Sequence, residues 1–308
     1  MYFNRNTLKH ISKSSYIYRE KRANMTKIAV IGPGAVGASL TFALSHTFDV
    51  TLIGRKNQTI HFQESNAQVQ KELTVRAIEA VQEPFDVIFI AVKTHQLAAV
   101  IPELGHLTHA NTLVILAQNG YGQLKQLADY HAYQAVVYIS GKKQEQHVTH
   151  FRDYKLHIQA DAHTKQLARQ LKDAPLELVL EDHIENAIWY KLIVNLGINT
   201  ITALGRDTAR VLHDDAMVQL CRHLLEEGTA VAQAEGIQLE DNIVDAIMKI
   251  YAGYPDEMGT SMYYDIMQGQ PLEVDAIQGY IYQRAQAYQI AVPHLETVYT
   301  LLAYQNAK

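Results

Sequence analysis

The chain has 308 residues, a hydrophobic content of 48% and a formal net charge of −5. This length suggests about two domains, and the acidic balance argues against a nucleic-acid-binding protein. A single cysteine, Cys221, excludes an internal disulfide framework and fits a reducing compartment. We therefore expect a cytoplasmic globular protein, with no apolar run approaching the roughly 20 residues that a membrane span needs.

Residues 1–24 differ in character from the rest of the chain. They carry six Lys and Arg residues against one acid, Glu20, and they lack the apolar core of a secretory signal. Met25 stands just before the first apolar run. We expect this segment to be a disordered leader or the result of a mis-assigned start.

A short β-branched run at residues 27–32 leads into a glycine-rich turn and then into a helical pattern that continues through Leu44. In a strand, G-x-G-x-x-G, helix arrangement the glycines allow a tight turn, close approach of a pyrophosphate and close packing of helix on strand. The helix N-terminus offers free N–H groups to phosphates. The pattern predicts a dinucleotide site formed by Gly32, Pro33, Gly34, Ala35, Val36 and Gly37.

The next predicted strand, residues 49–53, ends near Arg55 and Lys56. An NAD site usually places an acidic residue here to bind the ribose 2′-hydroxyl. A basic residue instead suits a 2′-phosphate through charge-assisted hydrogen bonds. We therefore predict NADPH as the cofactor, with Arg55 as a contact; the alternative is an ordinary surface charge.

Two further predicted strands, residues 86–92 and 112–117, end at Lys93 and Asn119. Ligands of open parallel sheets bind beyond the carboxyl ends of the strands. We expect Lys93 to contact a cofactor phosphate and Asn119 to lie near the nicotinamide. The alternative for Asn119 is a simple Asn-Gly turn.

Strand patterns at 135–139, 155–158 and 176–180 and a helix at 164–173 complete the predicted sheet domain, after which the pattern is helical only. The fold class is therefore α/β, with a Rossmann-type doubly wound sheet at residues 25–182 followed by an all-helical substrate and catalytic domain at 183–308. Helices are expected at 185–204, 214–235, 242–251, 261–268, 274–288 and 294–304. The histidine pairs His106/His109 and His147/His150 lack a zincin-like pattern, so we expect surface histidines and no metal.

The first of these helices carries Lys191, Asn195 and Asn199 at a spacing of four residues. This spacing places the three side chains on one face, while apolar residues cover the other faces. Buried polar groups are costly unless they meet partners or a ligand. The stripe therefore indicates an active site, the alternative being a lysine that reaches solvent and amides that cap backbone.

Two later segments also suggest chemistry. Ser261 opens a predicted helix, where it suits either a carboxylate receptor or an N-cap. Glu273 follows Pro271 closely, as an acid in the first turn of a helix often does.

In order and spacing, these motifs resemble the ketopantoate reductase (2-dehydropantoate 2-reductase) family from Met25 to the C-terminus. The resemblance implies NADPH-dependent reduction of the 2-keto group of ketopantoate to pantoate, in pantothenate and coenzyme A biosynthesis. It implies that Lys191 is the proton donor, that Glu273 lies beside it, and that the substrate contacts Asn195, Asn199, Ser261 and Asn119. It also implies that Arg55, Lys93, Asn119 and Glu273 contact the cofactor. An ammonium suits the role of Lys191, because hydride arriving at a ketone carbon leaves negative charge on oxygen.

The chain departs from the family pattern at two positions that often hold substrate-binding asparagines, which here are Met258 and Ala209. Two alternatives follow: a reductase of another branched 2-keto acid on the same scaffold, or a non-catalytic NADPH-binding regulator. A homodimer through the helical domain is compatible with Tyr251, Tyr254, Tyr263 and Tyr264, although core packing explains these residues equally well.

Overall fold

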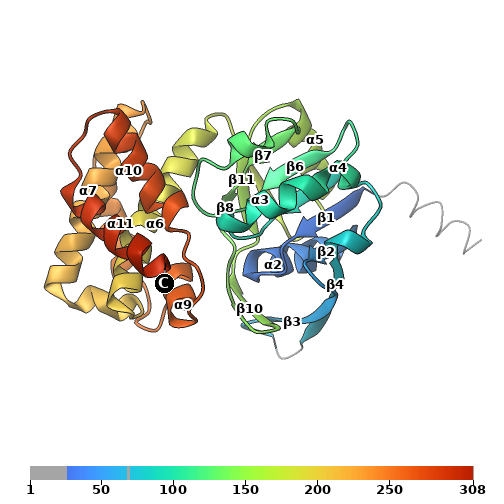
Figure 1. The fold of residues 1–308 in the computed structure, drawn as a ribbon, viewed down its shortest axis with the longest axis horizontal. Helices are drawn as coiled ribbons and strands as arrows, with labels where there is room; N and C mark the ends of the chain where they lie inside the picture. Colours follow the sequence, from blue (N-terminus) through green and yellow to red (C-terminus); the bar gives the residue numbers. More distant parts are fainter. Residues whose placement is uncertain (1–25, 68–69, 308) are drawn as a thin grey trace, which may run out of the picture.

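The computed structural model describes residues 26–67 and 70–307, so the expected leader at residues 1–24 lies outside the described residues. The chain forms two lobes that meet side by side, one built on a sheet and one built of helices (Figure 1). This arrangement confirms the predicted fold class. The last strand ends at Glu181, and the helical lobe begins with a helix at Ile184.

A nine-stranded sheet in the order β7-β6-β5-β1-β2-β4-β3-β10-β9 forms the centre of the first lobe. The strands from β7 to β4 in this order run parallel. A second sheet has the order β12-β11-β8. The strands are β1 (Lys27–Ile31), β2 (Asp49–Gly54), β3 (Gln58–Glu64), β4 (Lys71–Ala77), β5 (Val87–Ile90), β6 (Leu113–Leu116), β7 (Ala132–Gln134), β8 (Val136–Val137), β9 (Ser140–Gln144), β10 (His147–Arg152), β11 (Lys155–Gln159) and β12 (Glu177–Glu181).

Helices cover both faces of the parallel strands, which explains their continuous apolar sequences. In β1, Ile28 and Val30 face the apolar cluster that contains α2 (Ala35–Leu44). Ala29 and Ile31 face the opposite cluster, which contains α3 (Leu97–Val100) and α4 (Leu104–Leu107). A strand buried on both faces carries no polar alternation, and this is why the runs at β1, β5 and β6 were predictable.

Five strands, β3, β4, β7, β9 and β10, were not predicted from the sequence. β3, β4 and β10 are only half-buried and alternate polar with apolar side chains, β9 carries no apolar side chain, and β7 has only three residues. The expectation that His150 is a surface residue is wrong: it lies in β10, is buried, and its Nδ1 is 3.1 Å from Ser39 Oγ in α2. Burial lowers the pKa of His150. Among the described residues, no group of three or more His, Cys, Asp and Glu side chains is placed to hold a metal.

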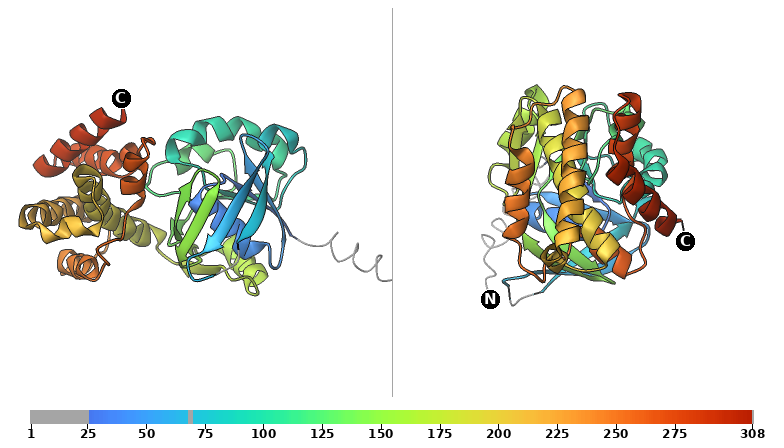
Figure 2. Two further views of the ribbon diagram at one scale, coloured as in Figure 1. Left: turned by 90° about the horizontal axis from the view of Figure 1, so that it is seen from below. Right: turned by 90° about the vertical axis from the view of Figure 1, so that its left-hand side faces the viewer.

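The second lobe is a bundle of helices beside the sheet lobe (Figure 2). It packs around α6, whose side chains are buried along most of its length. The 22 residues of α6 are apolar and long enough to cross a membrane, contrary to the expectation from the sequence, but most of the helix is enclosed by protein. The helices of this lobe are α6 (Ile184–Gly205), α7 (Asp215–Ala234), α8 (Ile243–Ala252), α9 (Ser261–Met267), α10 (Gln278–Ala287) and α11 (Pro293–Asn306). They confirm the predicted helices, and α5 (Ala162–Leu171) confirms the one predicted in the first lobe.

Three local predictions need correction. The helix expected at 274–288 is divided at Ile277 into a short 3₁₀ turn, Val274–Ala276, and α10. The N-cap of α9 is Thr260, which accepts a hydrogen bond from the Tyr263 N–H, and Ser261 is the first helical residue. Tyr251 is a core residue that donates a hydrogen bond to the Val194 carbonyl oxygen, so it cannot serve as an exposed contact between subunits.

Candidate active site

The glycine-rich turn between β1 and α2 has the geometry that a dinucleotide needs. Gly32 has a φ of +113°, and an added Cβ there would lie 2.7 Å from the Ala91 carbonyl carbon. An added Cβ at Gly37 would lie 1.9 Å from the Gly32 carbonyl oxygen, so α2 approaches the turn too closely for a side chain. At Gly34 an added Cβ would meet nothing within 4 Å. The turn therefore leaves room for phosphate oxygens in front of the first turn of α2.

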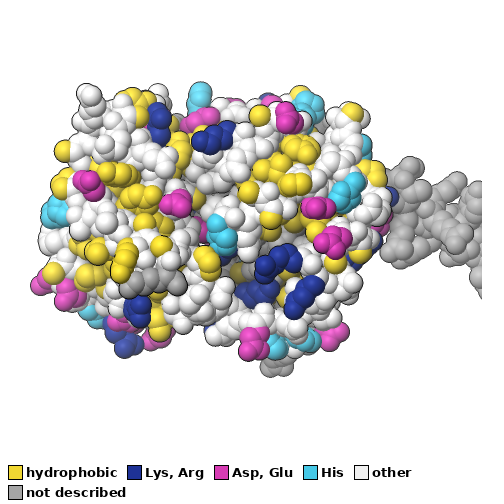
Figure 3. All heavy atoms as spheres, viewed as in Figure 1, with side chains coloured by type: hydrophobic (Ala, Val, Ile, Leu, Met, Phe, Trp, Pro, Cys, Tyr) yellow, Lys and Arg dark blue, Asp and Glu magenta, His cyan; other side chains and the backbone are white. Residues whose placement is uncertain are grey.

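Two cations lie beside this turn. Arg55 is exposed just beyond β2. Lys143, from β9, donates a hydrogen bond from Nζ to the Pro33 carbonyl oxygen at 2.7 Å. Burial lowers the pKa of Lys143, and the nearby Arg55 guanidinium lowers it further. Lys and Arg side chains gather on this face of the sheet lobe (Figure 3), so an anionic ligand would meet a positive surface here.

In the polar stripe of α6 the two amides are buried and Lys191 is partly buried. Lys191, Asn195 and Asn199 lie within one uninterrupted helix, so their four-residue spacing does place them on one face. Asn195 is 8% exposed and Asn199 is 4% exposed. The alternative in which these amides merely cap surface backbone does not fit this degree of burial.

The surroundings of Lys191 lower the pKa of its ammonium group. Its Nζ lies 5.0 Å from the centroid of the Tyr138 ring. Burial lowers the pKa of Lys191 to about 8, and the Arg152 guanidinium contributes to this shift, against an opposing effect of Asp153. Among the described residues, no carboxylate lies within ion-pair distance of the ammonium. The side chain can therefore release its proton near neutral pH.

A cavity opens at the junction of the two lobes, where Lys191 meets the ends of the parallel strands. The cavity is narrow and partly open to solvent. Strand ends of the sheet form one side, and α6 forms the other. The lining residues are Gln118, Asn119, Gly120, Gln134, Ala135, Val136, Val137, Ile188, Lys191, Leu192 and Asn195. The structure thus brings three of the predicted site residues, Asn119, Lys191 and Asn195, to one cavity.

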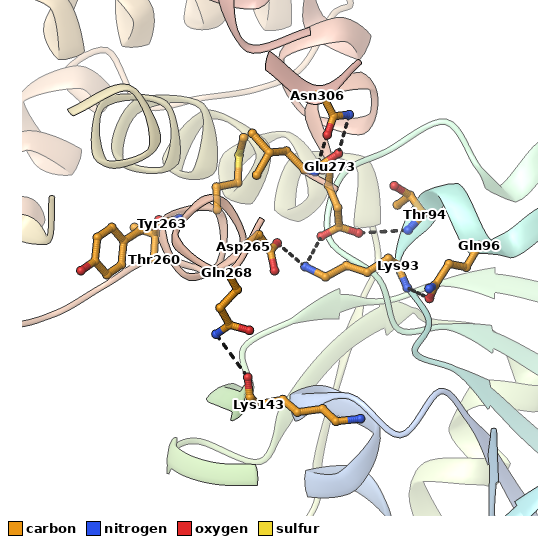
Figure 4. Close-up of polar contacts among 12 residues, drawn as sticks. Lys93, Thr94, Gln96, Lys143, Thr260, Tyr263, Asp265, Gln268, Glu273 and Asn306 are labelled. Atoms are coloured by element: carbon orange, nitrogen blue, oxygen red, sulfur yellow. Dashed lines mark hydrogen bonds and ion pairs between the residues drawn. The ribbon is translucent and has the colours of Figure 1, made fainter. Parts of the chain in front are cut away.

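A second cluster joins the lobes at the end of β5 (Figure 4). Lys93 Nζ lies 2.6 Å from Asp265 Oδ2, on α9, and 3.6 Å from Glu273 Oε2. The backbone N–H of Thr94 donates to Glu273 Oε1 at 3.1 Å. The expectation that Glu273 lies beside Lys191 is therefore wrong: in the structure its carboxylate pairs with Lys93, a partner that the sequence did not predict.

Burial and the neighbouring charges shift the pKa values of Lys93 and Asp265 in this cluster. Burial acts to lower the pKa of Lys93, but the carboxylates of Glu273 and Asp265 outweigh it, so the pKa is raised. Burial raises the pKa of Asp265, although Lys93 opposes this shift. The pairing fixes the orientation of Glu273 at the boundary between the sheet and the helical lobe.

Ser261 lies exposed on the first turn of α9. The N-cap hydroxyl of that helix, Thr260, is buried and lies 2.7 Å from the Thr202 hydroxyl on α6. This contact ties the start of α9 to the helix that carries Lys191. Ser261 is therefore positioned relative to α6 by its neighbour, and its role as a carboxylate receptor stays a prediction.

Comparison with known proteins agrees with this geometry. The family model "Ketopantoate reductase PanE/ApbA" matches residues 28–163, and its C-terminal counterpart matches residues 183–305. A 2-dehydropantoate 2-reductase of Mycobacterium tuberculosis is 32% identical over 90% of this chain and 97% of its own length. The structure of a dimeric ketopantoate reductase from Staphylococcus aureus is 52% identical, with a TM-score of 0.88 over 91% of this chain and 99% of that one. D-mandelate dehydrogenase with NADH and anilino(oxo)acetate shares the fold, with 20% identity and a TM-score of 0.82 over 91% of this chain and 98% of that one.

A dinucleotide turn beside a cavity that holds a partly buried lysine defines an oxidoreductase that uses a nicotinamide cofactor. The chain belongs to the ketopantoate reductase family, as the two family models and the Mycobacterium tuberculosis relative show. The residues around the glycine-rich turn fit such a cofactor, since the space at Gly34 and the cations beside it match a charged dinucleotide.

The ion cluster at the lobe junction gives a first prediction. Replacing Lys93 with Met leaves the carboxylates of Asp265 and Glu273 without their cation, so we expect the free energy of unfolding to fall by roughly 1–3 kcal/mol. This fall in the free energy of unfolding is smaller than that for a fully buried pair, because the Lys93 side chain is 34% exposed. Urea denaturation at neutral pH measures the difference.

A matched control is Lys155→Met, which breaks the exposed pair with Glu177 at 2.9 Å. We expect this change to cost less than about 1 kcal/mol. Equal losses in the two variants would contradict a special role for the Lys93 cluster.

Proposed function

We propose that this protein reduces 2-dehydropantoate to pantoate with NADPH, supplying pantothenate and coenzyme A biosynthesis. The observation that carries the proposal is the position of Lys191, which is partly buried and lines the cavity at the carboxyl ends of the parallel strands. The high identity to a ketopantoate reductase of Staphylococcus aureus supports the same substrate.

The bound nicotinamide supplies a hydride to the keto carbon of the substrate. The protein's part is to hold the keto oxygen beside Lys191, whose ammonium stabilises the charge that develops there and gives the oxygen its proton. Lys191 is then a neutral amine, which recovers a proton from solvent through the open mouth of the cavity. A pKa of about 8 keeps the ammonium mostly protonated at neutral pH while making the proton easy to transfer.

The other predicted site residues support this step. Asn119 and Asn195 line the same cavity and are proposed to hold oxygens of the substrate, with Asn199 one helical turn further along. Ser261 is proposed to bind the carboxylate. Glu273 and Lys93 are proposed to contact the cofactor at the junction of the lobes, each oriented by their mutual ion pair.

A second candidate is reduction of another branched 2-keto acid with the same residues. It is favoured by Met258 and Ala209, whose backbones are joined by a hydrogen bond of 2.9 Å and whose side chains carry no amide. Comparing turnover of ketopantoate with that of other 2-keto acids, followed at the nicotinamide absorbance, separates the two candidates. A non-catalytic regulator is the remaining alternative, and NADPH binding without reduction of any 2-keto acid would favour it.

The role of Lys191 is tested by Lys191→Ala. We expect turnover to fall by roughly 10² to 10⁴, because the proton donor is lost, while NADPH affinity stays near that of the wild type. For the wild type, kcat/KM for reduction should decrease as pH rises above about 8, since only the protonated amine is active.

The control for this test is Lys191→Arg, which retains the positive charge but does not titrate in this range. We expect its residual activity to lack the decrease above pH 8. Near-wild-type turnover of Lys191→Ala would rule out Lys191 as the acid.

The choice of NADPH depends on Arg55. We expect Arg55→Asp to weaken NADPH binding by roughly 10- to 100-fold and NADH binding much less, because only NADPH carries the 2′-phosphate. Arg169→Asp makes the same charge change on the exposed face of α5 and should leave both affinities unchanged. Equal losses for the two cofactors in Arg55→Asp would contradict the assignment.

We also propose a homodimer formed through the helical lobe. The Staphylococcus aureus relative is described as dimeric. Among the described residues, the exposed large hydrophobic side chains all belong to this lobe: Ile250, Met267, Tyr288, Leu301 and Tyr304. Leu301 and Tyr304 lie on the same helix, α11, which makes this helix the candidate contact between subunits.

Sedimentation equilibrium is expected to give twice the chain mass of 34.7 kDa. Leu301→Glu, which places a charge on the exposed face of α11, should shift the protein toward the monomer. A monomeric wild type at micromolar concentration would argue against the dimer.

A further inference from the structure

Two glutamines form the wall of the cavity that faces Lys191 and Asn195. Gln134 is the last residue of β7, and Gln118 lies just beyond the neighbouring strand β6, with which β7 pairs in parallel. Both side chains are 95% buried, and both residues line the cavity. Neither is used by the proton-transfer step described above.

Backbone carbonyls fix the orientation of both amides. Gln118 Nε2 donates to the Val92 carbonyl oxygen at 2.7 Å. Gln134 Nε2 donates to the carbonyl oxygens of Ala135 at 3.3 Å and Gln118 at 3.5 Å. Reversing either amide would set one oxygen against another, so the nitrogens belong where they are.

The amide oxygens are left without partners. Gln118 Oε1 and Gln134 Oε1 are both buried, and neither accepts a hydrogen bond from any residue that the structure describes. Buried acceptors in native proteins are nearly always satisfied, by protein, by water or by a ligand. Because both residues line the cavity beside the proton donor, a small shift of either side chain would bring its closed-off oxygen to a bound ligand, which can supply the missing donor.

The chemistry of that ligand group follows from the two oxygens. A carboxylate is an acceptor only and would be repelled. A wholly aliphatic tail would leave both acceptors unpaired and desolvated. A hydroxyl supplies the donor, and it fits a wall that is otherwise formed by small and aliphatic residues such as Ala135 and Val137.

We propose that Gln134, supported by Gln118, is a specificity-determining residue that accepts a hydrogen bond from a hydroxyl on the tail of the bound 2-keto acid. This inference rests on the proposed reduction of a 2-keto acid and names the substrate group, a tail hydroxyl, that the cavity recognises. An N–H of the nicotinamide carboxamide is the other possible donor, and the experiment distinguishes the two.

The test compares two substrates that differ by one hydroxyl: ketopantoate, which is 4-hydroxy-3,3-dimethyl-2-oxobutanoate, and 3,3-dimethyl-2-oxobutanoate. The wild type should prefer the hydroxylated acid in kcat/KM by roughly 10- to 100-fold, because the deoxy acid leaves a buried acceptor unpaired. Gln134→Met, which keeps the side-chain length without the amide, should lose most of this preference through slower reduction of ketopantoate alone.

Gln123→Met is the matched control, since Gln123 also has a buried, unpartnered Oε1 but does not line the cavity. It should keep the wild-type preference. NADPH affinity and the thermal unfolding midpoint are measured for each variant. In Gln134→Met the affinity should stay close to the wild type, while the midpoint should fall modestly, because the carbonyl oxygens of Ala135 and Gln118 lose a donor.

An unchanged preference in Gln134→Met would overturn the proposal. So would a loss of NADPH affinity with the preference intact, which would assign the acceptor to the carboxamide. Equal reduction of the two acids by the wild type would overturn it even if the variant did not fold. Failure of the wild type to reduce either acid would instead contradict the proposed function.

Discussion

An ammonium group removed from water loses much of the hydration that keeps it charged, and the rest of this structure is arranged around one such group. Lys191 lies on a helix that is apolar on its other faces and enclosed by the helical lobe. The helix cannot turn the lysine to solvent without exposing that apolar surface. The partly desolvated amine is therefore held where the strands of the sheet end, and its pKa falls to about 8.

Lys191 can act on a ligand at the strand ends only if the two lobes keep a fixed orientation relative to each other. An apolar cluster of Val136, Ile184 and Ile188 joins them, and specific polar contacts lie beside it. Lys93 from the sheet lobe meets Asp265 and Glu273 from the helical lobe, and the Gln268 side chain donates to the Lys143 carbonyl oxygen at 3.4 Å. Polar contacts of this kind set orientation more than they add stability, since their formation costs desolvation. Such a boundary suits an enzyme that must admit and release a cofactor.

The sequence predicted the parts of the molecule that are buried on all sides or follow a recognised motif. The parallel strands, α6 with its polar stripe, and the glycine-rich turn all belong to this group. The partners of Lys93 were not predictable, because Asp265 is 172 residues away in the chain and Glu273 lies further still, 179 residues beyond the neighbouring Thr94. Lys143 and Gln134 were also missed. Each lies in a short strand without a recognised motif, and only the fold shows that one reaches the glycine-rich turn and the other the cavity.

The strands β9 and β10 have a consequence for how the protein is made. The Pro33 carbonyl is held by Lys143, and Ser39 of α2 is held by His150, across separations of 110 and 111 residues. The glycine-rich turn is among the first parts of the fold to be synthesised, yet these supports arrive more than 100 residues later. Because non-local contacts form only after the loop between them has closed, the turn stays incompletely supported until β9 and β10 join the sheet. Cofactor binding is thus a property of the finished sheet and not of its first half.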